Sequence, residues 1–203
     1  MRTFRKRTTR ALGLTGAFAA ATLLLAACGN DDSMSGMDHG GTSSATAAAP
    51  SASGTFNDAD VMFAQMMIPH HEQALEMAEL ADGRAEDADV KKIVAAVEKA
   101  QDPEIRKMKA WLKGWGKPES AGMNHAMAGM MSEQDMKDLA AAKGKDFDRT
   151  FAELMIAHHE GAVEMAKAEQ KDGGNAEAKA LAGEVVAAQT AEIAELRKIL
   201  DRL

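Results

Sequence analysis

Histidine and methionine are the residues of this chain whose types and positions could do chemistry. Imidazole and thioether groups bind copper, particularly Cu(I), whereas carboxylate-rich oxygen sites suit Mg, Ca or Mn. The pattern therefore favours a site for Cu(I), and Ag(I) would suit the same donors. Every histidine lies within four residues of a methionine, and the six are His39, His70, His71, His125, His158 and His159.

Two adjacent histidine pairs, His70-His71 and His158-His159, occupy equivalent places in two similar segments. On a helix that turns about 100° per residue, His70 and His158 fall in the middle of the apolar face, with a methionine one turn before and two turns after. The second histidine of each pair, His71 or His159, lies about 100° around the helix axis from the first. The candidate metal ligands are Met67, His70, His71, Met77, Met155, His158, His159 and Met165.

A structural alternative exists for these residues. Methionines on a helix face commonly fill a core, and the histidines could form a hydrogen-bonded polar network. A buried polar group without a partner costs roughly 1–3 kcal/mol, so two histidine pairs are a costly way to fill a core. Gln101 and Gln189 hold equivalent positions on later segments and could orient the rings behind a metal.

Two further clusters lie in sequence rich in Gly, Ser and Asn, where little core is available to fill. Oxidation scavenging is the alternative role for such methionines. One cluster lies near the N-terminus and the other between the two segments. Their possible ligands are Met34, Met37 and His39, and Met123, His125, Met127, Met130 and Met131.

Several other site classes are excluded. The only cysteine is Cys28, so thiolate sites and disulfides within the domain are absent. His71-Glu72 lacks the second histidine of H-E-x-x-H, because the residue four positions on is Leu75. No Glu-x-x-His of a di-iron bundle occurs at the histidine pairs, and no catalytic triad or phosphate loop is evident. We expect binding without catalysis; Cu(I) oxidation would be the enzymatic alternative.

The N-terminus has the layout of a lipoprotein signal peptide. Basic residues precede an uncharged stretch from Ala11 to Ala27, and Leu25-Ala26-Ala27 leads into Cys28. A plain signal peptide or a membrane helix is the alternative, although 17 residues is short for a span. We expect residues 1–27 to be removed and Cys28 to carry the lipid (palmitate), which would anchor the protein to the cell membrane on its extracytoplasmic side.

Residues 28–54 are rich in Ser, Gly, Ala and Thr, a composition typical of a flexible linker. Removal of residues 1–27 would take away five of the 24 basic residues and none of the 31 acidic ones, leaving a formal charge of −12. Such a charge argues against nucleic-acid binding and suits cations as partners. No partner protein is identifiable.

A duplication organises the domain expected at residues 55–203. Residues 58–112 align with 146–200 at a constant offset of 88, with 21 of 55 positions identical. Apolar spacings of three and four residues predict two helices in each copy, and Pro103 should kink or split the second. The prediction is an all-α, ferritin-like four-helix bundle made of two repeated helical hairpins. The connection, 113–147, could hold a short helix capped by Ser132.

The phrases Met67-Ile68-Pro69-His70-His71-Glu72 and Met155-Ile156-Ala157-His158-His159-Glu160, with Gln101…Glu104-Ile105 and Gln189…Glu192-Ile193, resemble the domain-of-unknown-function 305 family over about residues 56–203. The resemblance implies a ferritin-like four-helix bundle in an exported protein, and Met and His ligands for copper, as in family members tied to copper resistance. The expected function is sequestration or handover of copper. The alternative is a non-metal interaction or envelope-stress module.

Overall fold

The computed structural model describes residues 54–120 and 127–203, which contain five helices and no strand. The helices are α1 (Asp58–Glu79), α2 (Ala88–Gly114), α3 (Glu133–Ala141), α4 (Gly144–Asp172) and α5 (Ala176–Arg202). The all-α prediction is confirmed, as is the short helix in the connection. Within these residues, no helix is both long and apolar enough to cross a membrane.

Side-chain caps set the starts of most helices. Asn57 and Ser132 form capping boxes with Asp60 and Asp135, and Asp87 and Asn175 accept hydrogen bonds from the first backbone N–H groups of α2 and α5. Helix α4 is the exception, because Lys143 before its first residue, Gly144, makes no side-chain cap bond.

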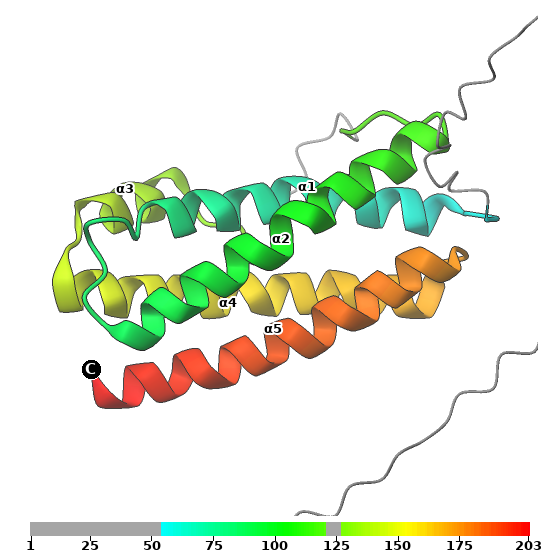
Figure 1. The fold of residues 1–203 in the computed structure, drawn as a ribbon. Helices are drawn as coiled ribbons and strands as arrows, with labels where there is room; N and C mark the ends of the chain where they lie inside the picture. Colours follow the sequence, from blue (N-terminus) through cyan, green and yellow to red (C-terminus); the bar gives the residue numbers. More distant parts are fainter. Residues whose placement is uncertain (1–53, 121–126) are drawn as a thin grey trace, which may run out of the picture. The chain divides into compact units, whose positions relative to one another are not determined.

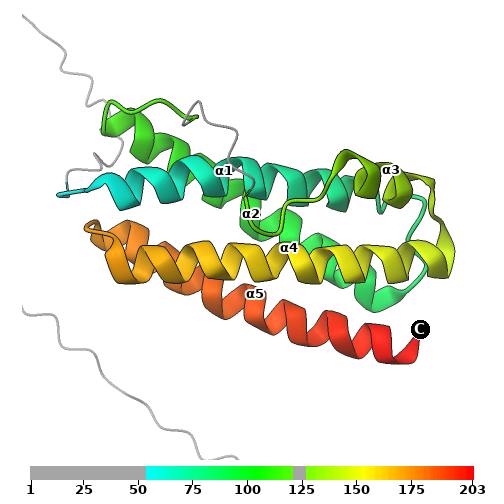
Figure 2. The same cartoon turned by 180° about the vertical axis from the view of Figure 1, so that it is seen from behind.

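Two helical hairpins, α1–α2 and α4–α5, form the bundle. Helix α1 packs against α2 and α4, and α4 packs against α5. Figures 1 and 2 show that α1 and α4 run in opposite directions side by side, and that α2 and α5 lie on the same face of this pair, with α2 crossing it obliquely. Since the hairpins are copies, this arrangement relates them by an approximate two-fold axis.

Helix α2 passes through Pro103 as one helix, so of the two predicted effects, a kink or a split, the split does not occur. Pro103 is exposed, and the buried residues on both sides of it, Gln101 and Ile105, stay on one continuous face. Packing of that face outweighs the lost backbone hydrogen bond. Pro69 is likewise accommodated inside α1.

The core has two apolar clusters, one toward each end of the bundle. The first includes Phe63, Trp111 and Leu181, and the second includes Phe147, Phe151 and Leu196. Along each of the four long helices, buried polar residues stand between the two clusters. A polar layer therefore crosses the middle of the bundle.

Candidate metal centre

The polar layer contains all four histidines of the two pairs and is called the histidine layer below. His70, His71 and His159 have no exposed surface, and His158 is 1% exposed. The sequence pattern placed only one histidine of each pair on the core face. The second histidine is buried as well, because two helices cover each of the helices that carry the pairs. Helix α1 is covered by α2 and α4, and helix α4 is covered by α1 and α5.

His70 and His158 meet at the centre of the layer. Their ring centroids are 3.8 Å apart and the rings are tilted by 41°. Among the described residues, no group forms a hydrogen bond with either ring nitrogen of either residue. Two imidazoles from the two copies thus lie in contact with four unpartnered nitrogens.

The two central histidines are held in their neutral form. Burial, supplemented by the neighbouring histidines, lowers the pKa of His70 to about 3 and that of His158 to about 2. A neutral imidazole has one nitrogen with a free lone pair, which is the form that binds metal. No proton has to be removed from these rings near neutral pH before a cation can bind.

The outer histidines are oriented by carboxylates. The Nε2 atom of His71 lies 2.8 Å from Oε2 of Glu104, and His159 and Glu192 repeat this contact at 2.8 Å. If Nε2 carries the proton in the neutral ring, it donates to the carboxylate and Nδ1 keeps its lone pair. Neither Nδ1 has a partner within the described residues.

Glu104 and Glu192 were not among the predicted site residues, and they take the position proposed for Gln101 and Gln189. Both glutamines are buried in the layer, but each Oε1 lacks a partner among the residues described. The bonds to the rings come from the glutamates three positions later. The signal was present, because residues three apart share a helix face.

The predicted methionines occupy different environments. Met67, Met77 and Met155 are fully buried, with Met67 in the first cluster and the other two in the second. Met165 is partly buried and lines a groove on the surface. Met67 and Met155 each lie one turn before the histidines of their own helix, from opposite sides of the layer.

The connection between the hairpins passes over α4 beside the histidine layer. A Cβ atom on Gly161 would lie 2.1 Å from the carbonyl oxygen of Ala128, so only glycine allows this approach. The side chain of Gln73 accepts from the N–H of Met131 (2.7 Å) and donates to its carbonyl (3.0 Å). Met127, Met130 and Met131 are partly buried. The other predicted ligands outside the bundle, Met34, Met37, His39, Met123 and His125, lie outside the described residues, as does Cys28.

Within the described parts of the chain, no group of three or more His, Cys, Asp or Glu side chains is arranged to hold a metal. What the layer offers is paired imidazoles, with thioethers one helical turn away. A soft d¹⁰ cation such as Cu(I) accepts few, neutral ligands of these two types.

Comparisons with known proteins agree with this architecture. The family described as Domain of unknown function (DUF305) matches residues 60–200. No curated protein matches the chain significantly. A putative secreted DUF305 protein from Streptomyces coelicolor is 31% identical, with a TM-score of 0.68, over 71% of this chain and 93% of that chain. A DUF305 fragment from Deinococcus radiodurans is 33% identical, with a TM-score of 0.67, over 72% of this chain and 98% of that fragment.

A third similar structure is CopM, solved with bound metal. Its Cu(I)-bound form is 32% identical to this chain, with a TM-score of 0.62, over 70% of this chain and 96% of CopM. CopM has also been solved in Cu(II)-bound and Ag-bound forms. A protein with a similar fold over nearly its whole length therefore binds copper and silver.

Proposed function

The chain belongs to the DUF305 family, and from this premise we propose that it binds Cu(I) in the histidine layer, for sequestration or handover. The main support for this proposal is the contact between His70 and His158, whose buried ring nitrogens have no hydrogen-bond partner within the described residues. The proposed ligands are drawn from the four histidines, with Met67 and Met155 as the thioethers next to them. Binding of copper by CopM supports the choice of metal.

The alternative role of the histidines as a polar network makes a different prediction. A network that stabilises a core has its donors and acceptors paired. His71 and His159 meet this requirement at one nitrogen each, through Glu104 and Glu192, but His70 and His158 do not meet it at all. A bound cation would use the lone pairs that the network leaves free.

We propose the same cellular setting for this function as the sequence suggests. The protein would be exported, with Cys28 lipidated and the domain held outside the cytoplasm. The secreted relative supports export. In this setting copper would meet the Met/His clusters of the N-terminal segment and the connection first and the bundle second. The proposal assigns no catalysis to the chain.

The test is thermal unfolding of the mature protein with and without Cu(I), under anaerobic reducing conditions. A ligand that binds only the folded state raises the melting temperature, by RT ln(1 + [L]/Kd) in free energy. Copper held by ligands that are close together in the sequence stays bound in the unfolded chain and contributes little to this rise. We therefore expect a rise in melting temperature that the double variant His70→Leu/His158→Leu loses.

The matched control is Gln101→Leu/Gln189→Leu, which removes two buried polar groups of the same layer but no imidazole. Both double variants should raise the melting temperature of the metal-free protein, because an unpartnered buried polar group costs roughly 1–3 kcal/mol. Only the histidine variant should lose the response to copper. A full response in the histidine variant would remove the histidine layer from the proposal.

A further inference from the structure

The two-fold relation between the hairpins creates two equivalent grooves between α1 and α4, and only one is covered. At the groove near the start of α4, helix α3 packs beside α4. Leu139 of α3 is completely buried there, in the apolar cluster that contains Phe147 and Phe151. Figure 2 shows α3 alongside the end where α4 begins, and no described helix covers the opposite end of the α1–α4 pair. There the structure has an open groove of about 340 Å³.

Methionines line this open groove. Met62 and Met66 come from α1 at a spacing of four residues, which puts them on one face, and Met165 comes from α4. Met62 is 56% exposed, and Met66 and Met165 are partly buried, so none of the three is fully committed to a core. The equivalents of Met62 and Met66 in the second copy are Thr150 and Leu154, so neither helix position requires a thioether for packing.

The wall of the groove is acidic. Glu164, Glu169 and Asp172 line it, and no basic residue does. Glu169 is only 2% exposed, and neither of its carboxyl oxygens accepts a hydrogen bond within the described residues. The equivalent position in the first copy is Ala81. Glu169 thus distinguishes the two copies, but the charges that favour a cation at this groove are those of the exposed Glu164 and Asp172.

We propose that the methionine groove, formed by Met62, Met66 and Met165, is a second site for a soft monovalent cation, separate from the histidine layer. The soft thioethers select Cu(I) or Ag(I), and the acidic wall raises the local concentration of cations. The proposal rests on the copper-binding function proposed above. It adds a surface site, reached from solvent, to the buried one.

The experiment uses Ag(I), which is not redox-active here, and the mature protein with ¹³C-labelled methionine methyl groups. Substoichiometric Ag(I) should shift the methyl resonances of Met62, Met66 and Met165 together. The triple variant Met62→Leu/Met66→Leu/Met165→Leu should bind one Ag(I) fewer in a competition titration with a chelator. The control Met108→Leu/Met136→Leu changes methionines outside both proposed sites and should bind the full number.

The failures of the two proposals are distinguishable. The variant His70→Leu/His158→Leu should keep the methyl shifts of the groove while losing the ion of the histidine layer. Unshifted groove methyls, or an unchanged stoichiometry in the triple variant, would overturn the groove site alone. Methyl shifts with an apolar peptide and none with Ag(I) would overturn it in favour of a docking groove. An ion lost only in the histidine variant would leave the proposed function intact.

Discussion

Glu169 and Asp60 are two carboxyl groups that interact beneath the turn between α4 and α5. Burial, followed by the adjacent Asp60, raises the pKa of Glu169 to about 8. Burial alone would raise the pKa of Asp60 too, but hydrogen bonds from the backbone of Asn57, Asn175 and Gly174 lower it. Glu169 is therefore protonated at neutral pH and can donate its proton to the Asp60 carboxylate, which accounts for two buried oxygens that accept no hydrogen bond.

This pair gives a prediction for stability against pH. The folded pKa of Glu169 lies above the unfolded value, so the native state binds the extra proton and stability falls as pH rises through about 8. Between pH 7 and 8 the lowered pKa values of His70 and His158 contribute little, because these two residues are largely neutral in the unfolded chain as well. The free energy of unfolding should fall by about 1 kcal/mol over that unit.

Urea unfolding of the metal-free protein at pH 7, 7.5 and 8 measures this slope. Glu169→Gln should flatten it, whereas Glu164→Gln, at an exposed position, should leave it unchanged. A slope that persists in Glu169→Gln would assign the titration to another group.

Among individual residues, the sequence identified the types proposed as metal ligands but not the groups that form hydrogen bonds with them. The histidines and methionines could be recognised because both copies repeat them. Glu104 and Gln101 share a face of α2, and only the way α2 packs against α1 decides which one reaches His71. Glu169 has no counterpart in the first copy, so the duplication gave no indication of its role.

Among the elements, the connection before α3 depends on one glycine and one glutamine. Gly161 of α4 allows the carbonyl of Ala128 to approach, and Gln73 of α1 holds Met131 through two hydrogen bonds. These contacts fix Ala128–Met131 across α1 and α4 next to the histidine layer. The methionines of this segment are thereby kept close to the bundle.

We predict that Gly161→Ala detaches this segment without unfolding the bundle. The added Cβ would lie 2.1 Å from the Ala128 oxygen, so the segment must move. Hydrogen exchange of the Met131 amide, which is bonded to Gln73, should accelerate at least about tenfold, equivalent to the loss of about 1.4 kcal/mol of protection.

The control for this prediction is Gly183→Ala in α5, where the nearest atom to the new Cβ is the flexible end of Gln170 at 3.2 Å. This change should stabilise the helix by up to about 1 kcal/mol and leave Met131 exchange unaltered. Equal exchange rates in Gly161→Ala and the unaltered protein would show that the segment is not held by this contact.

The elements themselves were largely predictable, because apolar spacing and side-chain caps act locally. The start of α4 at Gly144 has no such local signal, since Lys143 makes no side-chain cap bond. The first turn of α4 is instead stabilised by the burial of Phe147, a tertiary effect. The same effect keeps α2 unbroken at Pro103.

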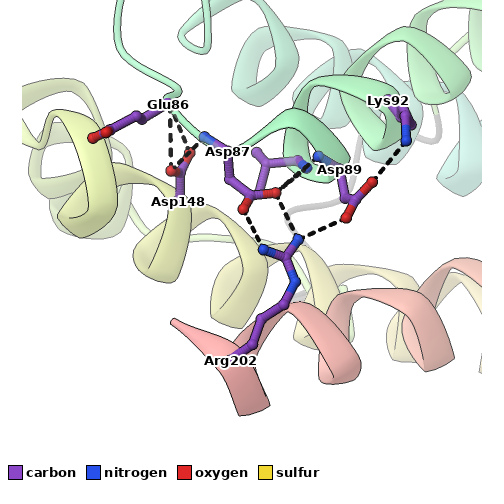
Figure 3. A network of polar contacts seen from close by, with 7 residues as sticks. Glu86, Asp87, Asp89, Lys92, Asp148 and Arg202 are labelled. Carbon is purple, nitrogen blue, oxygen red and sulfur yellow. Dashed lines mark hydrogen bonds and ion pairs between the residues drawn. The ribbon is translucent and has the colours of Figure 1, made fainter.

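Considering the whole molecule, the two hairpins are joined by reciprocal contacts at both ends. Asp148 of α4 accepts hydrogen bonds from the backbone of Glu86 and Asp87, in the turn of the other hairpin. Asp60 of α1 does the same for Gly174 and Asn175. Figure 3 shows the Asp148 end, where Arg202 near the C-terminus also bonds to Asp87 and Asp89.

Removing one of these carboxylates should weaken the docking of the hairpins. Asp148 is completely buried and its bonds are charge-assisted, so Asp148→Ala should lower the free energy of unfolding by about 3 kcal/mol. Asp146→Ala, two residues earlier and exposed, is the control and should change it by less than about 0.5 kcal/mol. Urea denaturation gives both values, and similar losses in the two variants would contradict the assigned role of Asp148.

The pairing of the hairpins followed from the duplication, since two similar amphipathic hairpins bury their apolar faces best against each other. The departures from two-fold symmetry could not be foreseen in the same way. They arise where the connection, which has no copy, packs on one side of the bundle only.

Gln73 and Gly161 occupy the same position in the two copies, yet one clamps the connection and the other makes room for it. In a symmetric dimer of single hairpins, each position would carry one residue type on both sides of the axis. A glycine there would forfeit the clamp, and a glutamine would block the close approach. Fusion of the two hairpins into one polypeptide removes that constraint, so that each half can vary independently while the shared histidines stay paired.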